Sequence, residues 1–139
     1  MTQPWFFKVY KGKSKNVLCE IIQKIDKEKY SVIKINKFIE KVKSSDTIIS
    51  VCMTKDESNR VPEWEEIAAV SMAVQNMWLS CYVNDIGSYW STPSLKDEYA
   101  KHSGLNSNQK SLGFFFMGAY DHIETPKVRE GLDSKVEWI

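Results

Sequence analysis

The segment from Asp85 to Pro93 holds the residues best suited to binding a ligand. Its sequence is Asp-Ile-Gly-Ser-Tyr-Trp-Ser-Thr-Pro, so a glycine that permits a turn is followed by aromatic and hydroxyl side chains. A loop attached to the end of a rigid element is a favourable place for a site, because the scaffold fixes its position. The segment therefore predicts a glycine-centred loop that can hold a planar ligand.

No familiar catalytic pattern accompanies this segment. The sequence has no Ser-His-Asp set, no paired-carboxylate signature, no phosphate-binding loop and no dinucleotide glycine fingerprint. His102 and His122 have no partner at metal-ligand spacing. Cys19, Cys52 and Cys81 lie in apolar segments at wide spacing, which predicts buried, reduced thiols in a cytosolic protein.

The charge balance gives no argument for a nucleic acid or an acidic membrane as partner. Lys plus Arg is 19 and Asp plus Glu is 18, a formal net charge of +1. The only arginines are Arg60 and Arg129. Because a guanidinium can grip a phosphate or carboxylate with two parallel hydrogen bonds, Arg129 stands out, although an isolated surface arginine is the commoner case.

A long helix is predicted immediately before the loop. Pro62 suits the first helical position, and the glutamates after it favour the positive end of the helix dipole. Residues 67–83 are apolar on nearly every side, so this helix must lie in a core or between two subunits. Periodicity alone leaves both interpretations open, a buried helix of a monomer and a helix at a dimer interface.

The remaining patterns predict one layered domain of α+β (mixed α/β) class. Glycines at 113 and 118 in one strand predict close approach by another backbone. The predicted strands are 5–10, 47–53 and 111–118, the predicted helices start at Ser14, fill the second half of 27–43 and span 94–102, and residues 135–139 form a β-prone tail.

Five segments occur in an order that is itself informative. They are Thr2–Tyr10, Arg60–Glu66 with the apolar helix after it, Ile86–Pro93, Ser111–Gly118, and Pro126–Gly131 with Val136–Ile139. In this order they resemble the FMN-dependent nitroreductase family, in its branch of compact single-domain reductases. Each motif alone is weak, but together they cover essentially the whole chain.

The resemblance implies a nitroreductase-like sheet flanked by helices in an intertwined homodimer. The apolar helix would pack at the interface, and the C-terminal strand would pair with the partner's sheet. FMN would lie between the subunits, and the residues that the resemblance assigns to it are Gln3, Trp90, Ser91, Thr92 and Arg129.

Within that set, the roles differ. A backbone N–H in the 91–92 region is the expected donor to the flavin, and Arg129 is the expected phosphate contact. The resemblance leaves two roles for Trp90 equally open, packing and contact with the flavin. The implied activity is hydride transfer from NAD(P)H through FMN to a nitro compound, quinone or similar acceptor, in the cytoplasm, and it needs no side-chain acid or base.

The chain also departs from the family. Full-length relatives carry an N-terminal helical segment with an Arg-Arg-Ser-type motif that grips the flavin phosphate, whereas this sequence begins at Met1-Thr2-Gln3. We therefore expect a single domain, 1–139, that lacks this segment. Two hypotheses remain: an FMN-dependent oxidoreductase, and a non-catalytic dimeric relative that binds flavin weakly or not at all.

Overall fold

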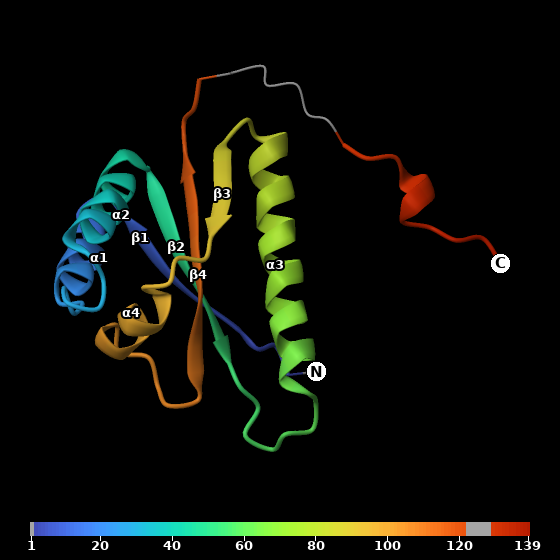
Figure 1. Cartoon of the computed structure of the whole chain (residues 1–139), viewed down its shortest axis with the longest axis horizontal. Coiled ribbons are helices and arrows are strands. Elements are labelled where there is room, and N and C mark those ends of the chain that lie inside the picture. Colours follow the sequence, from blue (N-terminus) through green and yellow to red (C-terminus); the bar gives the residue numbers. More distant parts are fainter. Residues whose placement is uncertain (1, 122–128) are drawn as a thin grey trace.

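A computed structural model describes residues 2–121 and 129–139 of the chain. It is a four-stranded antiparallel sheet with helices on both faces (Figure 1). Helices α1, α2 and α4 cover one face, and α3 crosses the other. In chain order the elements are β1 (Trp5–Lys11), α1 (Ser14–Gln23), α2 (Val32–Ser44), β2 (Thr47–Thr54), α3 (Glu63–Val83), β3 (Gly87–Ser91), α4 (Lys96–His102), β4 (Gln109–Gly118) and a short 3-10 helix (Leu132–Ser134).

The sheet has the strand order β1-β2-β4-β3, so β2 and β4 are interior and β1 and β3 are the edges. Ile48 of β2 lies opposite Phe116 of β4, and Tyr89 of β3 lies opposite Phe116 on the other side. The predicted strands at 5–10, 47–53 and 111–118 are confirmed, including the interior position of the second.

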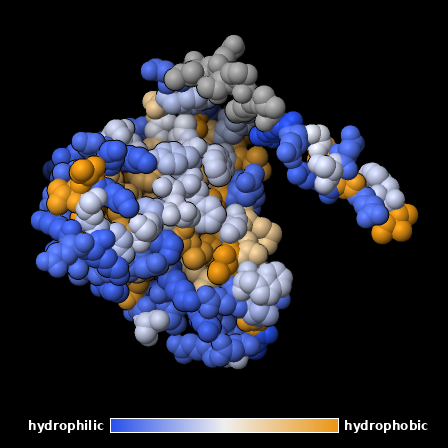
Figure 2. All heavy atoms as spheres, viewed as in Figure 1, coloured by the Kyte–Doolittle hydropathy of each residue, from blue (hydrophilic) through white to orange (hydrophobic). Residues whose placement is uncertain are grey.

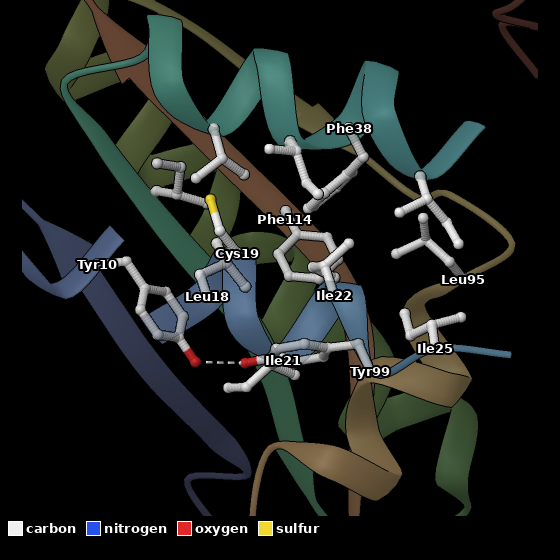
Figure 3. Close-up of a cluster of buried hydrophobic side chains, with 14 of the residues drawn as sticks. Tyr10, Leu18, Cys19, Ile21, Ile22, Ile25, Phe38, Leu95, Tyr99 and Phe114 are labelled. Carbon is white, nitrogen blue, oxygen red and sulfur yellow. Dashed lines mark hydrogen bonds between the residues drawn. The ribbon is translucent and has the colours of Figure 1, made fainter. Parts of the chain in front are cut away.

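The side chains of β4 alternate between the two faces of the sheet and contribute to a hydrophobic core on each face. Because successive side chains of a strand point to opposite faces, Phe114 and Phe116 pack under α1, α2 and α4, whereas Phe115 packs under α3. We call these the first core (Figure 3) and the second core. The first core is Tyr10, Leu18, Cys19, Ile21, Ile22, Ile25, Ile35, Phe38, Ile39, Val42, Ile48, Leu95, Tyr99, Phe114 and Phe116, and the second is Val51, Met53, Val70, Val74, Cys81 and Phe115.

Two buried phenols connect β1 to α4 within the first core. The hydroxyls of Tyr10 and Tyr99 lie 2.8 Å apart and share a hydrogen bond, and Tyr99 is fully buried (Figure 3). Burial raises the pKa of both phenols, so each stays protonated and able to donate. The three cysteines are also buried and free, as the sequence predicts.

The apolar helix is confirmed, and α3 begins at Glu63, directly after Pro62. Its buried residues Val70, Val74 and Cys81 face the sheet. The opposite side keeps large apolar side chains in solvent, among them Leu79 at 53 % and Tyr82 at 79 % exposure. The single sheet face therefore covers only part of the helix. None of the helices in the described ranges combines the length and apolarity that a bilayer crossing needs.

The prediction of a loop at 86–93 is wrong for most of its length. Residues Gly87–Ser91 form the edge strand β3 and pair with β4 from Gly118 to Phe114. The aromatic residues of this segment explain the difference, because Tyr89 stacks on Phe116 while Trp90 packs against the second core. Only Thr92 and Pro93 continue as a connection into α4.

The β-prone tail forms no strand in this chain. Residues 135–139 follow the short 3-10 helix in an irregular conformation, and Trp138 is 93 % exposed. The tail extends away from the sheet (Figure 1), so it pairs with neither edge strand of its own chain. A β-prone sequence forms a strand only where a partner strand completes its hydrogen bonds.

Replacing Tyr99 by phenylalanine tests the link between β1 and α4. Tyr99→Phe leaves the buried Tyr10 hydroxyl without this partner, so we expect the free energy of unfolding to fall by about 1–2 kcal/mol in urea titrations. Tyr30→Phe is the control, because among the described residues its hydroxyl makes only an exposed 3.4 Å bond to the Ser94 carbonyl, and we expect almost no change. Equal effects of the two substitutions would contradict the assignment.

Candidate functional site

The edge strand β3 is the central element of the candidate site. It pairs with β4 along one side only, so its other backbone edge is open. Alternate residues of such a strand point their N–H and C=O groups away from the sheet, where a ligand can use them. Figure 2 shows residues of intermediate hydropathy gathered over this region, between the hydrophilic helix layer and the apolar residues along α3.

Trp90 presents a buried donor to this region. Its ring is partly buried against the second core, yet its indole Nε1 is shielded from solvent and has no hydrogen-bond partner in the described part of the chain. A buried donor without a partner costs about 1–3 kcal/mol, so proteins satisfy such groups with water or a ligand. Trp90 is thus both a packing residue and a candidate ligand donor.

A glycine lets the neighbouring strand approach Trp90 closely. Gly113 has a φ of +121° and lies beside a register shift between β2 and β4. A Cβ atom there would stand 2.4 Å from the Ser91 carbonyl oxygen and 3.1 Å from Trp90 Nε1. The close backbone approach that the sequence predicts at this glycine is therefore confirmed.

The remaining residues of the 90–92 group lie at the end of β3. Ser91 is half-buried and pairs with Phe114, while Thr92 is exposed just beyond the strand. Trp90, Ser91 and Thr92 thus form a wall at the end of β3, in which the Trp90 indole faces the second core beside Gly113 while the open backbone edge lies on the side away from β4. Such a wall can hold the edge of a flat, hydrogen-bonding ring.

Gln3 does not join this wall within one chain. It precedes β1, at the opposite edge of the sheet, three strand spacings or about 14 Å from β3. Its backbone has a φ of +47°, and it borders a polar cavity of about 520 Å³ together with Asp56, Arg60 and Asn108.

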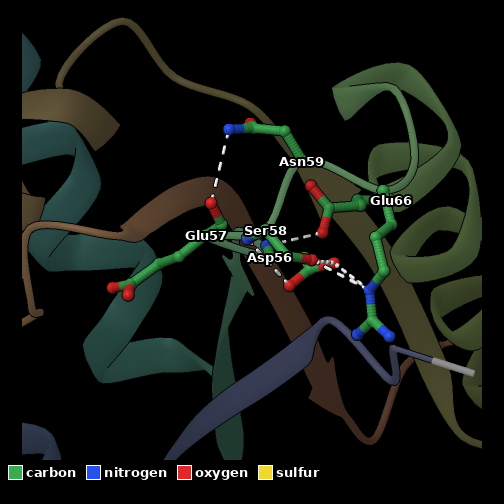
Figure 4. A network of polar contacts seen from close by, with 6 residues as sticks. Asp56, Glu57, Ser58, Asn59 and Glu66 are labelled. Carbon is green, nitrogen blue, oxygen red and sulfur yellow. Dashed lines mark hydrogen bonds and ion pairs between the residues drawn. The ribbon is translucent and has the colours of Figure 1, made fainter.

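The polar cavity near Gln3 is lined by residues of a hydrogen-bond network that fixes the start of α3 (Figure 4). The buried carboxylate of Glu66 accepts the Asp56 backbone N–H at 2.8 Å. The Asp56 carboxylate accepts hydrogen bonds from the Ser58 hydroxyl at 2.6 Å and from Arg60 Nε at 3.3 Å. Hydrogen bonds from Ser58, followed by Arg60, hold the pKa of Asp56 below its usual value. Arg60 therefore stabilises the loop that precedes α3.

Arg129 is also apart from β3 in this chain. It is exposed at the start of the C-terminal segment 129–139, which lies beyond α3 in Figure 1. Of the five residues assigned by resemblance, the structure brings together Trp90, Ser91 and Thr92, and leaves Gln3 and Arg129 elsewhere.

A cavity of about 450 Å³ at the other end of β3 contains residues that sequence reasoning missed. Its aromatic lining comes from α3, β3 and β4, and consists of Trp78, Tyr82, Tyr89, Phe116 and Tyr120. No local sequence signal joins these positions, because strand register and helix packing bring them together.

Comparison with known proteins identifies the family to which this chain belongs. The model of the Nitroreductase family matches residues 1–119, and the chain belongs to this family. YdjA of Escherichia coli K12, named as an NAD(P)H nitroreductase, is 23 % identical over 122 residues, which cover 84 % of this chain and 65 % of YdjA. The chain thus spans less than two thirds of the length of this curated relative.

Solved structures share the fold. A nitroreductase-like family protein from Bacillus cereus superposes with a TM-score of 0.85 at 23 % identity, covering 98 % of this chain and 73 % of that one. The FMN-dependent nitroreductase NfnB from Mycobacterium smegmatis, solved in complex with NADPH, gives a TM-score of 0.70 at 14 % identity, covering 99 % and 79 %. The predicted α+β, nitroreductase-like fold is confirmed.

Substitution of Gly113 tests the close approach that shapes the Trp90 wall. Gly113→Ala places a Cβ against the Ser91 carbonyl and strains a positive φ, so we expect a loss of about 3 kcal/mol or more in the free energy of unfolding. Gly104→Ala is the control, because its φ is +70° but no atom lies within 4 Å of the added Cβ. We expect about 1 kcal/mol there. Chemical denaturation measures both, and equal losses would show that β3 can move aside.

Proposed function

We propose that the protein is an FMN-dependent oxidoreductase that acts as a homodimer. Its electron donor would be NAD(P)H, and its acceptors would be nitro compounds, quinones or similar molecules. The observation that carries the proposal is strand β3, which combines an open backbone edge with a Trp90 Nε1 that is buried on its second-core face and has no hydrogen-bond partner among the described residues. The NfnB neighbour, named as FMN-dependent and solved with NADPH, supports this cofactor and this donor.

The wall at Trp90–Thr92 fits the ring of a flavin. The flavin ring is flat and carries carbonyl and nitrogen acceptors along one edge, which match the backbone N–H groups of an open strand edge. When bound, FMN supplies two-electron chemistry, taking a hydride from NAD(P)H and delivering it, with a proton, to the acceptor. The chain's part is to hold and orient the ring, which agrees with a site built from backbone and an indole.

The two remaining assigned residues require a second copy. Gln3 lies at the opposite edge of the sheet and the segment 129–139 lies beyond α3, so under this proposal Gln3 and Arg129 reach the cofactor across a subunit interface. Under this proposal, Arg129 holds the phosphate and Gln3 contacts the ring from the partner. A guanidinium donates two parallel N–H bonds to a phosphate from one planar fork, a geometry that the ammonium of a lysine does not offer.

The exposed apolar side of α3 supports the homodimer. Met72, Leu79 and Tyr82 are all more than half exposed, and Trp64 and Val83 add to the same helix. A contiguous apolar surface of this kind marks an interface in a stable protein. The partner's sheet would likewise provide the missing strand edge for residues 135–139. The three free, buried thiols fit a reducing compartment, and we propose the cytoplasm.

One observation favours the alternative, a non-catalytic dimeric relative that binds flavin weakly or not at all. Among the described residues, both arginines lie away from β3, so a single chain offers its ring wall no guanidinium. A titration of the purified protein with FMN separates the alternatives. Binding in the micromolar range or tighter supports the oxidoreductase, and no binding at high FMN supports the alternative.

Arg129→Ala tests the phosphate contact directly. Loss of a charge-assisted hydrogen bond costs about 1.5–3 kcal/mol, so we expect the Kd for FMN to rise about 10- to 100-fold in a flavin-fluorescence titration. Arg60→Ala removes the same charge from the loop before α3 and should leave the Kd within about twofold. An unchanged Kd for Arg129→Ala would remove that residue from the site.

Leu79→Glu tests the interface. A carboxylate placed in an apolar contact costs about 3 kcal/mol, so we expect the dimer dissociation constant to rise about 100-fold in sedimentation experiments, with FMN affinity falling in parallel. Ile33→Glu is the matched control on α2, where Ile33 is 67 % exposed on the opposite layer. Dissociation by the control, or none by Leu79→Glu, would place the interface elsewhere.

A further inference from the structure

Positive charge is concentrated in one stretch of the chain. Residues 8–43 hold eleven lysines, no arginine and four carboxylates, a formal charge of +7, whereas the whole chain has a net charge of +1. The four carboxylates are Glu20, Asp26, Glu28 and Glu40. This stretch includes α1 and most of α2, which lie side by side on the first-core face of the sheet (Figure 1). Charge that is balanced over the whole sequence is therefore segregated in the fold.

The solvent side of α1, α2 and the residues next to them is a basic surface, which we call the basic layer. The apolar stripes of both helices pack into the first core, so the opposite faces lie in solvent. Lys29 forms an ion pair with Glu98, and Lys8 and Lys15 donate to backbone carbonyls. Eight further lysines are exposed and form no ion pair within the described part of the chain: Lys11, Lys13, Lys24, Lys27, Lys34, Lys37, Lys41 and Lys43.

Exposed aliphatic side chains lie among these lysines. Ile33 of α2 is 67 % exposed, and Val17 of α1 is 50 % exposed. Residues four or seven positions apart share one face of a helix, so Ile33 lies on the face of Lys37, and Val17 on the face of Lys24. Figure 2 shows the helix layer as mainly hydrophilic, with a small apolar group exposed within it. Each helix thus presents an aliphatic side chain with an ammonium group close by.

The types of side chain in the basic layer distinguish between anionic partners. Protein interfaces are enriched in aromatic residues, Met and Arg and depleted in Lys, a composition that fits the exposed Trp64, Met72 and Tyr82 of α3 instead. Nucleic-acid sites use arginine and stacking aromatic rings, whereas this layer has no arginine and its Tyr30 and Phe38 pack with the first core. A bilayer surface with anionic lipids requires only spread positive charge and shallow apolar groups. The basic layer has both.

We propose that the basic layer docks the protein onto a bilayer surface that contains anionic lipids. The lysine ammonium groups lie among the lipid headgroups, while Ile33 and Val17 enter the boundary between headgroups and acyl chains. Helix α3 lies on the opposite face of the sheet, so the contact leaves the exposed side of α3 free for a second copy. The docking uses no residue assigned to the flavin and stands apart from the proposed oxidoreductase function.

Co-sedimentation of the full chain with lipid vesicles tests the docking. At low salt we expect binding to vesicles of phosphatidylserine mixed with phosphatidylcholine, and none to phosphatidylcholine alone, with release as the ionic strength rises. A lysine near an anionic surface contributes about fivefold in affinity, so Lys24→Gln combined with Lys37→Gln should weaken binding about 25-fold. Lys55→Gln combined with Lys135→Gln is the matched control, because it removes the same charge from outside the basic layer. Its affinity should stay within about twofold of wild type.

A further variant separates a bilayer from other polyanions. Ile33→Ser changes an exposed side chain, so it should fold normally, weaken vesicle binding about three- to tenfold and leave retention on a heparin column unchanged. The inference is overturned if wild type does not bind phosphatidylserine vesicles at low salt, if the two lysine double variants behave alike, or if Ile33→Ser binds vesicles as wild type does. Duplex DNA bound more tightly than the vesicles would assign the basic layer to a nucleic acid instead.

Discussion

Helix α3 carries apolar side chains around its whole circumference, while one sheet face can cover only one stripe of them. Val70, Val74 and Cys81 are buried against β2 and β4, but Leu79 and Tyr82 remain in solvent. Each large apolar side chain removed from water contributes about 1.5–3 kcal/mol, so a surface that covers this side gains substantial stability. The rest of the domain is arranged in keeping with such a covering surface. Helix α3 leads directly into β3, and the open edge of the sheet at β3 lies beside α3.

The candidate site depends on the interactions that fix the position of β3. Its position depends on Gly113, which permits the Ser91 carbonyl to approach, and on two aromatic residues that anchor opposite faces of the strand. Trp90 turns an indole donor toward the second core, and Tyr89 turns a stacked ring toward α2.

Much of the fold could be predicted from the sequence, because α3 and the strands at 5–10, 47–53 and 111–118 carry strong local patterns. The strand at Gly87–Ser91 could not, since a five-residue segment of glycine, serine and aromatic residues becomes a strand only through pairing with β4. For the site, position in sequence alone makes Trp90, Ser91 and Thr92 neighbours at the end of β3, and their contact with FMN stays a prediction. It could not show that Gln3 lies at the opposite sheet edge, because strand order is a tertiary property.

Sedimentation of the wild-type chain with FMN, followed at both the protein and the flavin absorbance, tests the central claim most directly. One chain has a mass of 16.1 kDa. If two copies meet along α3 and enclose the cofactor, flavin absorbance will sediment with a species of twice that mass. Protein that sediments as a monomer over a wide concentration range, with all flavin left in the slow fraction, would contradict both the interface and the cofactor site.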